Sequence, residues 1–97
     1  MNDEILFFCN WYRKVAYPQF KNGAQHPFLK LDQQRRIHDT LEEFCQSFYC
    51  DYHALQKMAV SFFERVERSD HNLNHFATPG LLEVRFYDVA YYGEPDL

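Results

Sequence analysis

The sequence has no apolar run long enough to cross a membrane. Its longest uninterrupted run, Ile5–Cys9, falls far short of the roughly 20 predominantly apolar residues that a transmembrane helix needs. Asp3 and Glu4 stand where a secretory signal would carry basic residues, and no small-residue cleavage site follows them. We therefore expect a cytoplasmic protein without a membrane-spanning segment.

Cysteine is sparse, and its count is odd. Cys9, Cys45 and Cys50 cannot all pair within one chain, which favours reduced thiols in a reducing compartment. Cys9 and Cys45 fall on the apolar faces of expected helices, where a free cysteine usually packs as a small hydrophobic side chain. Zinc ligation by Cys45 and Cys50 is disfavoured, because no second pair of ligands accompanies them.

An excess of positive charge is also missing, since the net charge is -4. Residues 1–50 are balanced, and the whole deficit lies in the second half of the chain. Binding to duplex nucleic acid depends on a basic stripe that releases phosphate counterions, so direct binding is disfavoured. A local patch at Lys30, Arg35 and Arg36 supports the alternative, a nucleic-acid-associated regulator or accessory factor of a mobile element or replication system.

Motifs of catalysis are absent from the sequence. There is no glycine-rich phosphate loop, nucleophile elbow or framed pair of carboxylates. Cys50 near His53 lacks the third group that would orient a base. His71 and His75 would share one helical face and are weak candidates for metal ligands, but their spacing supplies no third ligand. We expect a protein that is not an enzyme and needs no metal or cofactor.

Aromatic side chains are what the chain has in abundance, with ten Phe, seven Tyr and one Trp. A chain of 97 residues with 46% hydrophobic residues is expected to form one domain with one core. We place this domain at residues 1–92, followed by a short, disordered acidic tail at residues 93–97. The rings exceed what a small core needs, so some of them are expected to face a partner.

Apolar spacing of three and four residues predicts a first helix over residues 3–16, with Ile5 and Phe8 on its core face. Phe7 and Trp11 widen the apolar surface until it nearly encircles the first two turns. A helix that is apolar all round must be covered on more than one side. Its second face is therefore expected to be buried in the bundle or to bind a partner.

Prolines and an Asn-Gly pair in residues 17–28 predict a long ordered loop. Three aromatic residues of this segment are expected to pin the loop to the helices: Tyr17, Phe20 and Phe28.

A second helix with one buried face is expected over residues 32–49, with Asp32 as its N-cap. Asp51 is expected to cap a third helix, which should end near Arg68, where Ser69 offers a new cap. A connection this short predicts that the second and third helices are antiparallel neighbours.

The last part of the domain begins with a single helical turn expected at residues 71–75. Thr78 and Pro79 then predict a restart, with threonine as N-cap and proline at the first helical position. Residues 81–92 fit either a helix or a strand, and we favour a helix because no second strand is evident to pair with them.

Together these patterns predict an all-α fold, a compact bundle of about four helices with a long ordered loop between the first and the second. The predicted function is a small non-enzymatic protein–protein interaction module, either a homodimer or a subunit that docks onto a protein partner. Tyr and Trp are frequent anchors of protein interfaces. The candidate anchors are Phe7, Trp11, Tyr87, Tyr91 and Tyr92.

Overall fold

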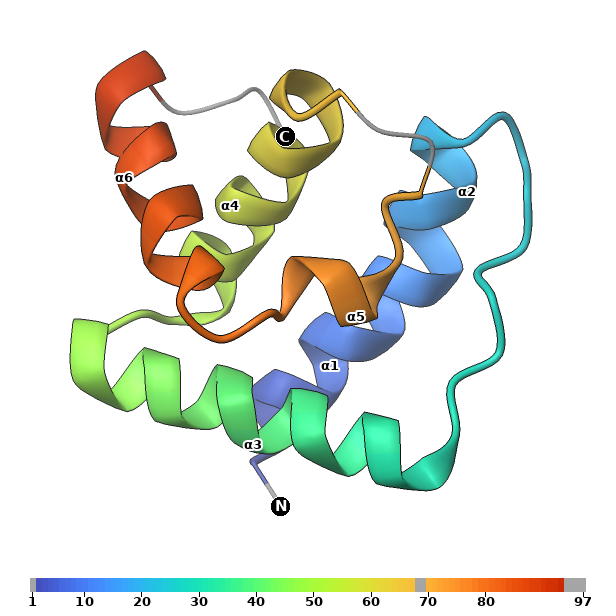
Figure 1. Ribbon diagram of the computed structural model, residues 1–97, viewed down its shortest axis with the longest axis horizontal. Coiled ribbons are helices and arrows are strands. Elements are labelled where there is room, and N and C mark those ends of the chain that lie inside the picture. Colours follow the sequence, from blue (N-terminus) through green and yellow to red (C-terminus); the bar gives the residue numbers. More distant parts are fainter. Residues whose placement is uncertain (1, 68–69, 94–97) are drawn as a thin grey trace.

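Helices make up all the regular secondary structure of residues 2–67 and 70–93, the part of the chain that the computed structural model describes. They are, in chain order (Figure 1), α1 (Asp3–Trp11), the π-helix η1 (Tyr12–Ala16), α2 (Tyr17–Phe20), α3 (Leu31–Phe48), α4 (Tyr52–Arg65), α5 (Leu73–Phe76) and α6 (Leu81–Tyr92). The predicted all-α class is confirmed. Residues 94–97 of the expected tail lie outside the described range.

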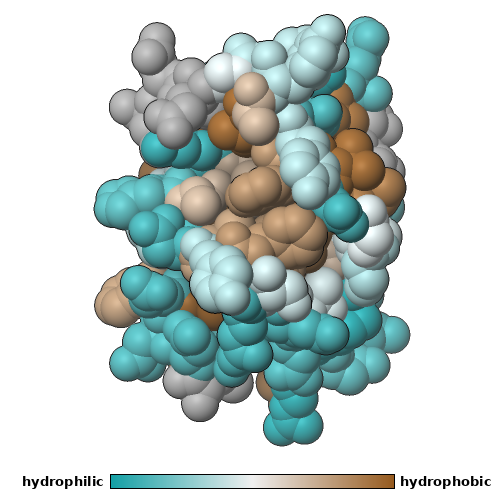
Figure 2. All heavy atoms as spheres, turned by 90° about the vertical axis from the view of Figure 1, so that its left-hand side faces the viewer, coloured by the Kyte–Doolittle hydropathy of each residue, from teal (hydrophilic) through white to brown (hydrophobic). Residues whose placement is uncertain are grey.

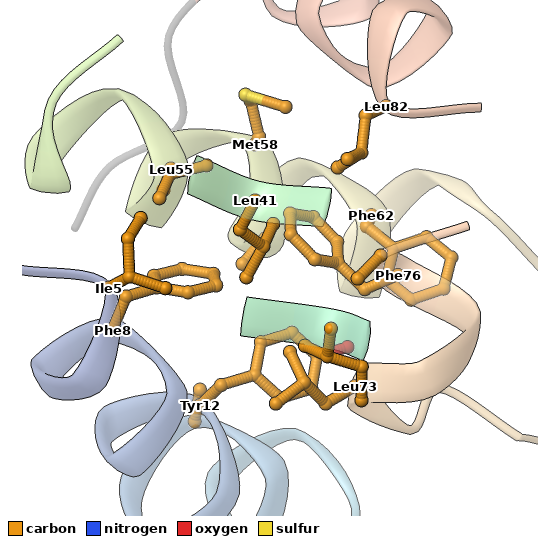
Figure 3. Packing of buried hydrophobic residues seen from close by; sticks show 14 of the residues in the cluster. Ile5, Phe8, Tyr12, Leu41, Leu55, Met58, Phe62, Leu73, Phe76 and Leu82 are labelled. Carbon is orange, nitrogen blue, oxygen red and sulfur yellow. The ribbon is translucent and has the colours of Figure 1, made fainter. Parts of the chain in front are cut away.

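Side chains from all the longer helices converge in one core (Figure 3). Full burial of an apolar side chain of this size contributes about 1.5–3 kcal/mol. The largest fully buried side chains are Phe8, Tyr12, Ile37, Leu41, Leu55, Met58, Phe62, Leu73, Phe76 and Leu82.

The first helix is longer than predicted, because α1, η1 and α2 follow one another without a break to Phe20. The expectation that it ends at Ala16, ahead of Pro18, is wrong. The backbone N–H of Tyr17 donates to the carbonyl of Tyr12, five residues back, which is the wider turn of a π-helix. Pro18 then lies in the first turn of α2, where a missing N–H donor is tolerated.

The loop between α2 and α3 spans residues 21–30 and is held by a histidine rather than by Phe28. His26 Nε2 accepts a hydrogen bond from the Leu73 N–H at 2.8 Å, and its ring lies 4.8 Å from that of Tyr17. Phe28 is 84% exposed, so its predicted pinning role is wrong. Tyr17 is buried as expected, but it belongs to the helix rather than to the loop.

Phe20 also contacts the core as predicted, from the end of α2. Its ring stacks on that of Phe63, with the two centroids 4.9 Å apart.

The N-cap of α3 lies two positions before the predicted one. Lys30 is the N-cap, and its backbone N–H donates to the side-chain oxygen of Gln33. Asp32 instead accepts from the N–H of Gln33 within the first turn, so its predicted role is wrong. The predicted stripe is confirmed in this helix, because Ile37 and Leu41 are fully buried.

The end of α3 has an unusual backbone at Tyr49. Its φ of 54° and ψ of 40° lie in the left-handed region, which glycine normally occupies at this position after a helix. The Cys50 N–H donates to the Cys45 carbonyl, the 6→1 bond of a Schellman motif. A side chain in this conformation costs about 1–2 kcal/mol because Cβ approaches the following carbonyl oxygen.

The α4 helix is capped by Asp51 as predicted, since the carboxylate accepts from the Ala54 N–H at 2.9 Å. It does not lie antiparallel along α3, so that expectation is wrong. The left-handed Tyr49 turns the chain steeply, and α3 packs against α1 and α5 while α4 rises away from it (Figure 1). The helix ends at Arg65, and the predicted end near Arg68 and cap at Ser69 fall outside the described residues.

The favoured helix at residues 81–92 is confirmed as α6, and the strand alternative is wrong. Its predicted cap is also wrong. The Leu81 N–H donates to the Thr78 carbonyl, and Gly80 has a φ of 84°, the pattern of a type II turn with proline second and glycine third. Gly80 rather than Thr78 therefore precedes the helix. The one-turn helix expected at 71–75 is α5, which starts two residues later and ends one residue later than expected.

Replacing Tyr49 tests the strain at the end of α3. We expect Tyr49→Gly to raise the free energy of unfolding by about 1 kcal/mol, because glycine adopts a positive φ without a Cβ clash. Chemical denaturation of the dilute protein measures this change. Asn22 also has a positive φ, but asparagine tolerates it, so Asn22→Gly should give a smaller gain. A less stable Tyr49→Gly variant would contradict the assignment of strain.

The pH dependence of stability tests the role of His26. Burial lowers its pKa from the ordinary value of 6.5, and Arg13 adds to this, against opposing effects of the Pro27 carbonyl and Asp70. The unfolded chain therefore takes up a proton below about pH 6.5 while the folded chain does not. Stability should be full above that pH and fall as the pH drops toward the lowered pKa.

The His26→Ala variant should be less stable at pH 7, because the Leu73 N–H loses its acceptor, and its stability should change less between pH 7 and pH 5. Denaturation curves across this range measure both effects. The exposed His53 is the matched control, because His53→Ala removes an imidazole while the Leu73 N–H keeps its acceptor, so stability at pH 7 should be retained. An undiminished slope in His26→Ala would refute the role given to this ring.

Candidate interaction surface

Four of the five predicted anchor rings are exposed. Phe7 is 68% and Tyr91 82% exposed, and Tyr87 and Tyr92 are also more than half exposed. Trp11 differs, because it packs against the core and its ring lies 5.8 Å from that of Phe8. The surplus of rings identified in the sequence therefore reaches the surface mainly on α1 and α6.

The exposed side of α6 carries an apolar stripe, formed by Val84, Tyr87 and Tyr91 at spacings of three and four. Residues with this spacing share one helical face. Leu82 and Arg85, on the opposite side, are buried. Phe86 and Val89 also pack against the core from this inner side. The helix thus has apolar residues on both its inner and outer faces, and we call the outer set the α6 stripe.

A groove lies beside this stripe, between α4 and α6. It encloses about 450 Å³. Figure 2 views the side of the molecule that carries α6 and the end of α3, and apolar side chains gather there in a hollow bordered by hydrophilic ones. We call it the α4–α6 groove; its apolar lining is Ala54, Met58, Phe86, Val89 and Ala90, and its polar rim includes Asp51, His53 and Lys57.

Stacked rings connect the groove to the α3 helix. Phe44 and Phe48 stack with centroids 4.5 Å apart, and Phe86 of α6 lies 5.3 Å from Phe48. Tyr87 follows at 5.5 Å from Phe86. Each such pair adds about 0.5–1.5 kcal/mol beyond the burial of its area, so this chain of rings holds α6 in place beneath its exposed stripe.

Phe7 reaches the same region from the other side of α4. It lines a hollow with Glu4, Asp51, Tyr52 and His53. Asp51 and His53 also line the α4–α6 groove. The two hollows therefore adjoin around the first turn of α4, and the exposed ring of α1 and the groove beside α6 belong to one stretch of surface.

Tyr49 is an exposed ring that the sequence patterns did not single out. It is 95% exposed and follows Phe48, whose ring packs onto α6. The apolar stripe of α3 ends just before Tyr49, so helical periodicity does not predict the direction of the Tyr49 side chain. A bulky residue at the site where glycine usually ends a helix is the signal that could have identified it.

Arg85 is a buried cation that sequence reasoning also missed. Its guanidinium donates to the carbonyls of Phe76 and His75, each at 3.0 Å, and lies 4.3 Å from the centre of the Phe62 ring. Arginine suits this position because its planar fork binds several acceptors and stacks on aromatic rings. Arg85 thereby joins the end of α5 to α6 and α4.

The three cysteines are protonated at neutral pH. Burial raises the pKa of Cys9 to about 11 and that of Cys45 to about 12, and it also raises the pKa of Cys50. A thiol is a good nucleophile or metal ligand only as the thiolate. The packing role predicted for Cys9 and Cys45 agrees with their half-buried positions against the core.

The two candidate metal-binding histidines lie in different settings. His71 precedes α5, and its ring nitrogens meet the Val66 carbonyl at 2.6 Å and the Lys21 ammonium at 2.9 Å. His75 lies within α5, with Nε2 3.4 Å from an oxygen of Asp70. The expected shared helical face is therefore wrong. No group of three potential metal ligands occurs among the described residues.

The three basic residues of the nucleic-acid-binding alternative do not form one patch of exposed, unengaged cations. Lys30 and Arg35 are exposed, whereas Arg36 donates to the side chain of Asn74. Arg35 instead meets Arg13 at a smaller groove of about 100 Å³ between the first helix and α3. Binding of nucleic acid through this region stays a prediction.

Comparisons with known proteins return no match to any family model, curated protein or solved structure. Within residues 2–67 and 70–93, no helix has the length and hydropathy to cross a membrane.

Removing the buried guanidinium tests the attachment of α6. We expect Arg85→Met to lower the free energy of unfolding by about 2–4 kcal/mol, because the end of α5 loses two charge-assisted donors. Arg65 also lies over a ring, that of Tyr92, but at the exposed surface. Arg65→Met is therefore the matched control and should cost about 1 kcal/mol or less. Equal losses in chemical denaturation would refute the role of Arg85.

Proposed function

We propose that this chain is a small non-enzymatic interaction module that self-associates through the α6 stripe and the surface around the α4–α6 groove. The observation that carries the proposal is the apolar outer face of α6. Val84, Tyr87 and Tyr91 are exposed on a helix whose inner face already packs on the core. A surface helix of a monomer is normally polar on its outer side.

The amount of exposed ring surface supports this proposal. If a whole aromatic side chain counts as about 200 Å², the exposed fractions of Phe7, Tyr49, Tyr87, Tyr91 and Tyr92 correspond to roughly 700 Å². A stable protein interface buries about 800 Å² on each partner.

The residue types support a protein partner. Tyrosine has a large apolar ring and a hydroxyl that remains solvated in the free protein, and it is frequent among interface residues that contribute most to affinity. Glu83 and Asp88 flank the α6 stripe, and Arg65 lies over Tyr92 at its end. An apolar centre with charged neighbours is the usual composition of such an interface.

Sedimentation equilibrium over a range from low micromolar to near millimolar concentration tests the proposal. We expect the wild-type chain to dimerise. The double variant Tyr87→Ser, Tyr91→Ser should have a dimer dissociation constant about tenfold higher or more, because exposed rings of this kind contribute most of the affinity. Both positions are exposed, so the variant should fold normally by circular dichroism.

The matched control removes an equally exposed ring elsewhere. Phe28 lies in the 21–30 loop and is 84% exposed, so Phe28→Ser should leave self-association unchanged. A wild-type chain that is monomeric throughout the range, or a double variant that dimerises like the wild type, would contradict the proposal.

A further inference from the structure

The left-handed backbone of Tyr49 ends α3 through the Cys50–Cys45 hydrogen bond, but it is costly for a residue that carries a side chain. Its φ of 54° is one that side chains other than Asn and Asp seldom adopt. The ring is 95% exposed and has no aromatic or hydrogen-bonding partner among residues 2–67 and 70–93. The helix end therefore accounts for the backbone of Tyr49, but not for a large ring at a position that glycine usually occupies.

The position of Tyr49 places it next to the α4–α6 groove. Phe48, the preceding residue, packs onto Phe86, which lines the groove. Asp51, two residues later, lies on the groove's polar rim. The end of α3 and the whole of α6 also lie on the same side of the molecule (Figure 1). The residue that carries this exposed ring therefore lies close to the apolar groove, between Phe48 and Asp51 in the chain.

The groove suits a tyrosine side chain in size and in chemistry. Its volume of about 450 Å³ lies within the range of pockets that hold compact ligands. Met58, Phe86 and Val89 offer apolar contact to the ring. Asp51 and His53 on the rim have side chains that can hydrogen-bond a phenolic hydroxyl, which a buried tyrosine requires.

We infer that Tyr49 of each copy inserts into the α4–α6 groove of a second copy, so that two insertions form one symmetric dimer. This inference rests on the proposed function and names its anchor and its pocket. A twofold interface needs one surface that carries both complementary parts, and the neighbouring ring and groove meet this condition. The second copy is the occupant because the chain itself supplies the side chain that fits.

Two single variants separate the ring from the groove. Tyr49→Gly removes the ring and relieves the backbone, and Ala90→Arg fills the groove from an exposed position. We expect each variant to fold, as judged by circular dichroism and thermal unfolding, and to weaken self-association by about tenfold or more in sedimentation equilibrium. Asn22→Gly relieves a positive φ without removing a ring, so it is the matched control and should dimerise like the wild type.

Mixing the two variants tests reciprocity directly. The Ala90→Arg copy keeps its Tyr49, and the Tyr49→Gly copy keeps an open groove, so a heterodimer retains one complete insertion. We expect the mixture to associate more tightly than either variant alone. Native mass spectrometry resolves the heterodimer by its mass.

The outcomes distinguish this inference from the proposed function. If the wild type dimerises and Tyr49→Gly dimerises equally well, the insertion is refuted while self-association stands. If both single variants are weakened but their mixture is not restored, reciprocal insertion is refuted. If the wild type is monomeric throughout, the proposed function fails and the insertion fails with it.

Discussion

The hydroxyl of Tyr12 makes the buried polar contact on which the second half of the fold depends. It donates to the backbone carbonyl of His71 at 2.6 Å, while its ring is fully buried and lies 5.1 Å from Phe63 and 5.4 Å from Phe76. A buried hydroxyl without a partner is costly, so the rings can close around Tyr12 only when this bond forms. The segment that follows α4 is thereby held against the π-helical part of the first helix.

The position of α6 follows from this attachment. The His71 ring bonds the end of α4 through the Val66 carbonyl, and Asn72 caps α5 immediately afterwards. Arg85 then joins the carbonyl end of α5 to α6. Because these contacts determine which side of α6 faces inward, they also determine that the tyrosines of its other side face solvent.

The spacing of apolar residues predicted where the helices lie more accurately than the capping and proline signals predicted where they begin and end. The stripes of α3 and α4 are strongly periodic, and their predicted core residues, such as Leu41 and Phe62, are buried. Pro18 predicts the end of the first helix, yet a π-turn before it lets the helix continue. Thr78 has the composition of an N-cap, yet the Gly80 turn takes its place. In both cases the same residues are compatible with two backbone conformations, and the structure adopts the one that the sequence pattern did not predict.

The candidate surface was predicted in part. Tyr87, Tyr91 and Tyr92 were identified from composition and spacing and are exposed. Trp11 was identified as a candidate anchor for the same reason, but it packs on the core. Apolar periodicity did not predict this packing, because it does not distinguish the inner face of a helix from its outer face. Tyr49 and the α4–α6 groove depend on the direction in which the chain leaves α3, and no local pattern specifies that direction.

The sequence by itself determined the helical class, the main core stripes and the surplus of rings over what the core requires, because each of these follows from residue type and local spacing. Only the tertiary structure decided which rings remain outside, since burial depends on contacts between segments far apart in the chain. It also decided that Tyr49 stands beside a groove, because one left-handed residue turns α4 away from α3.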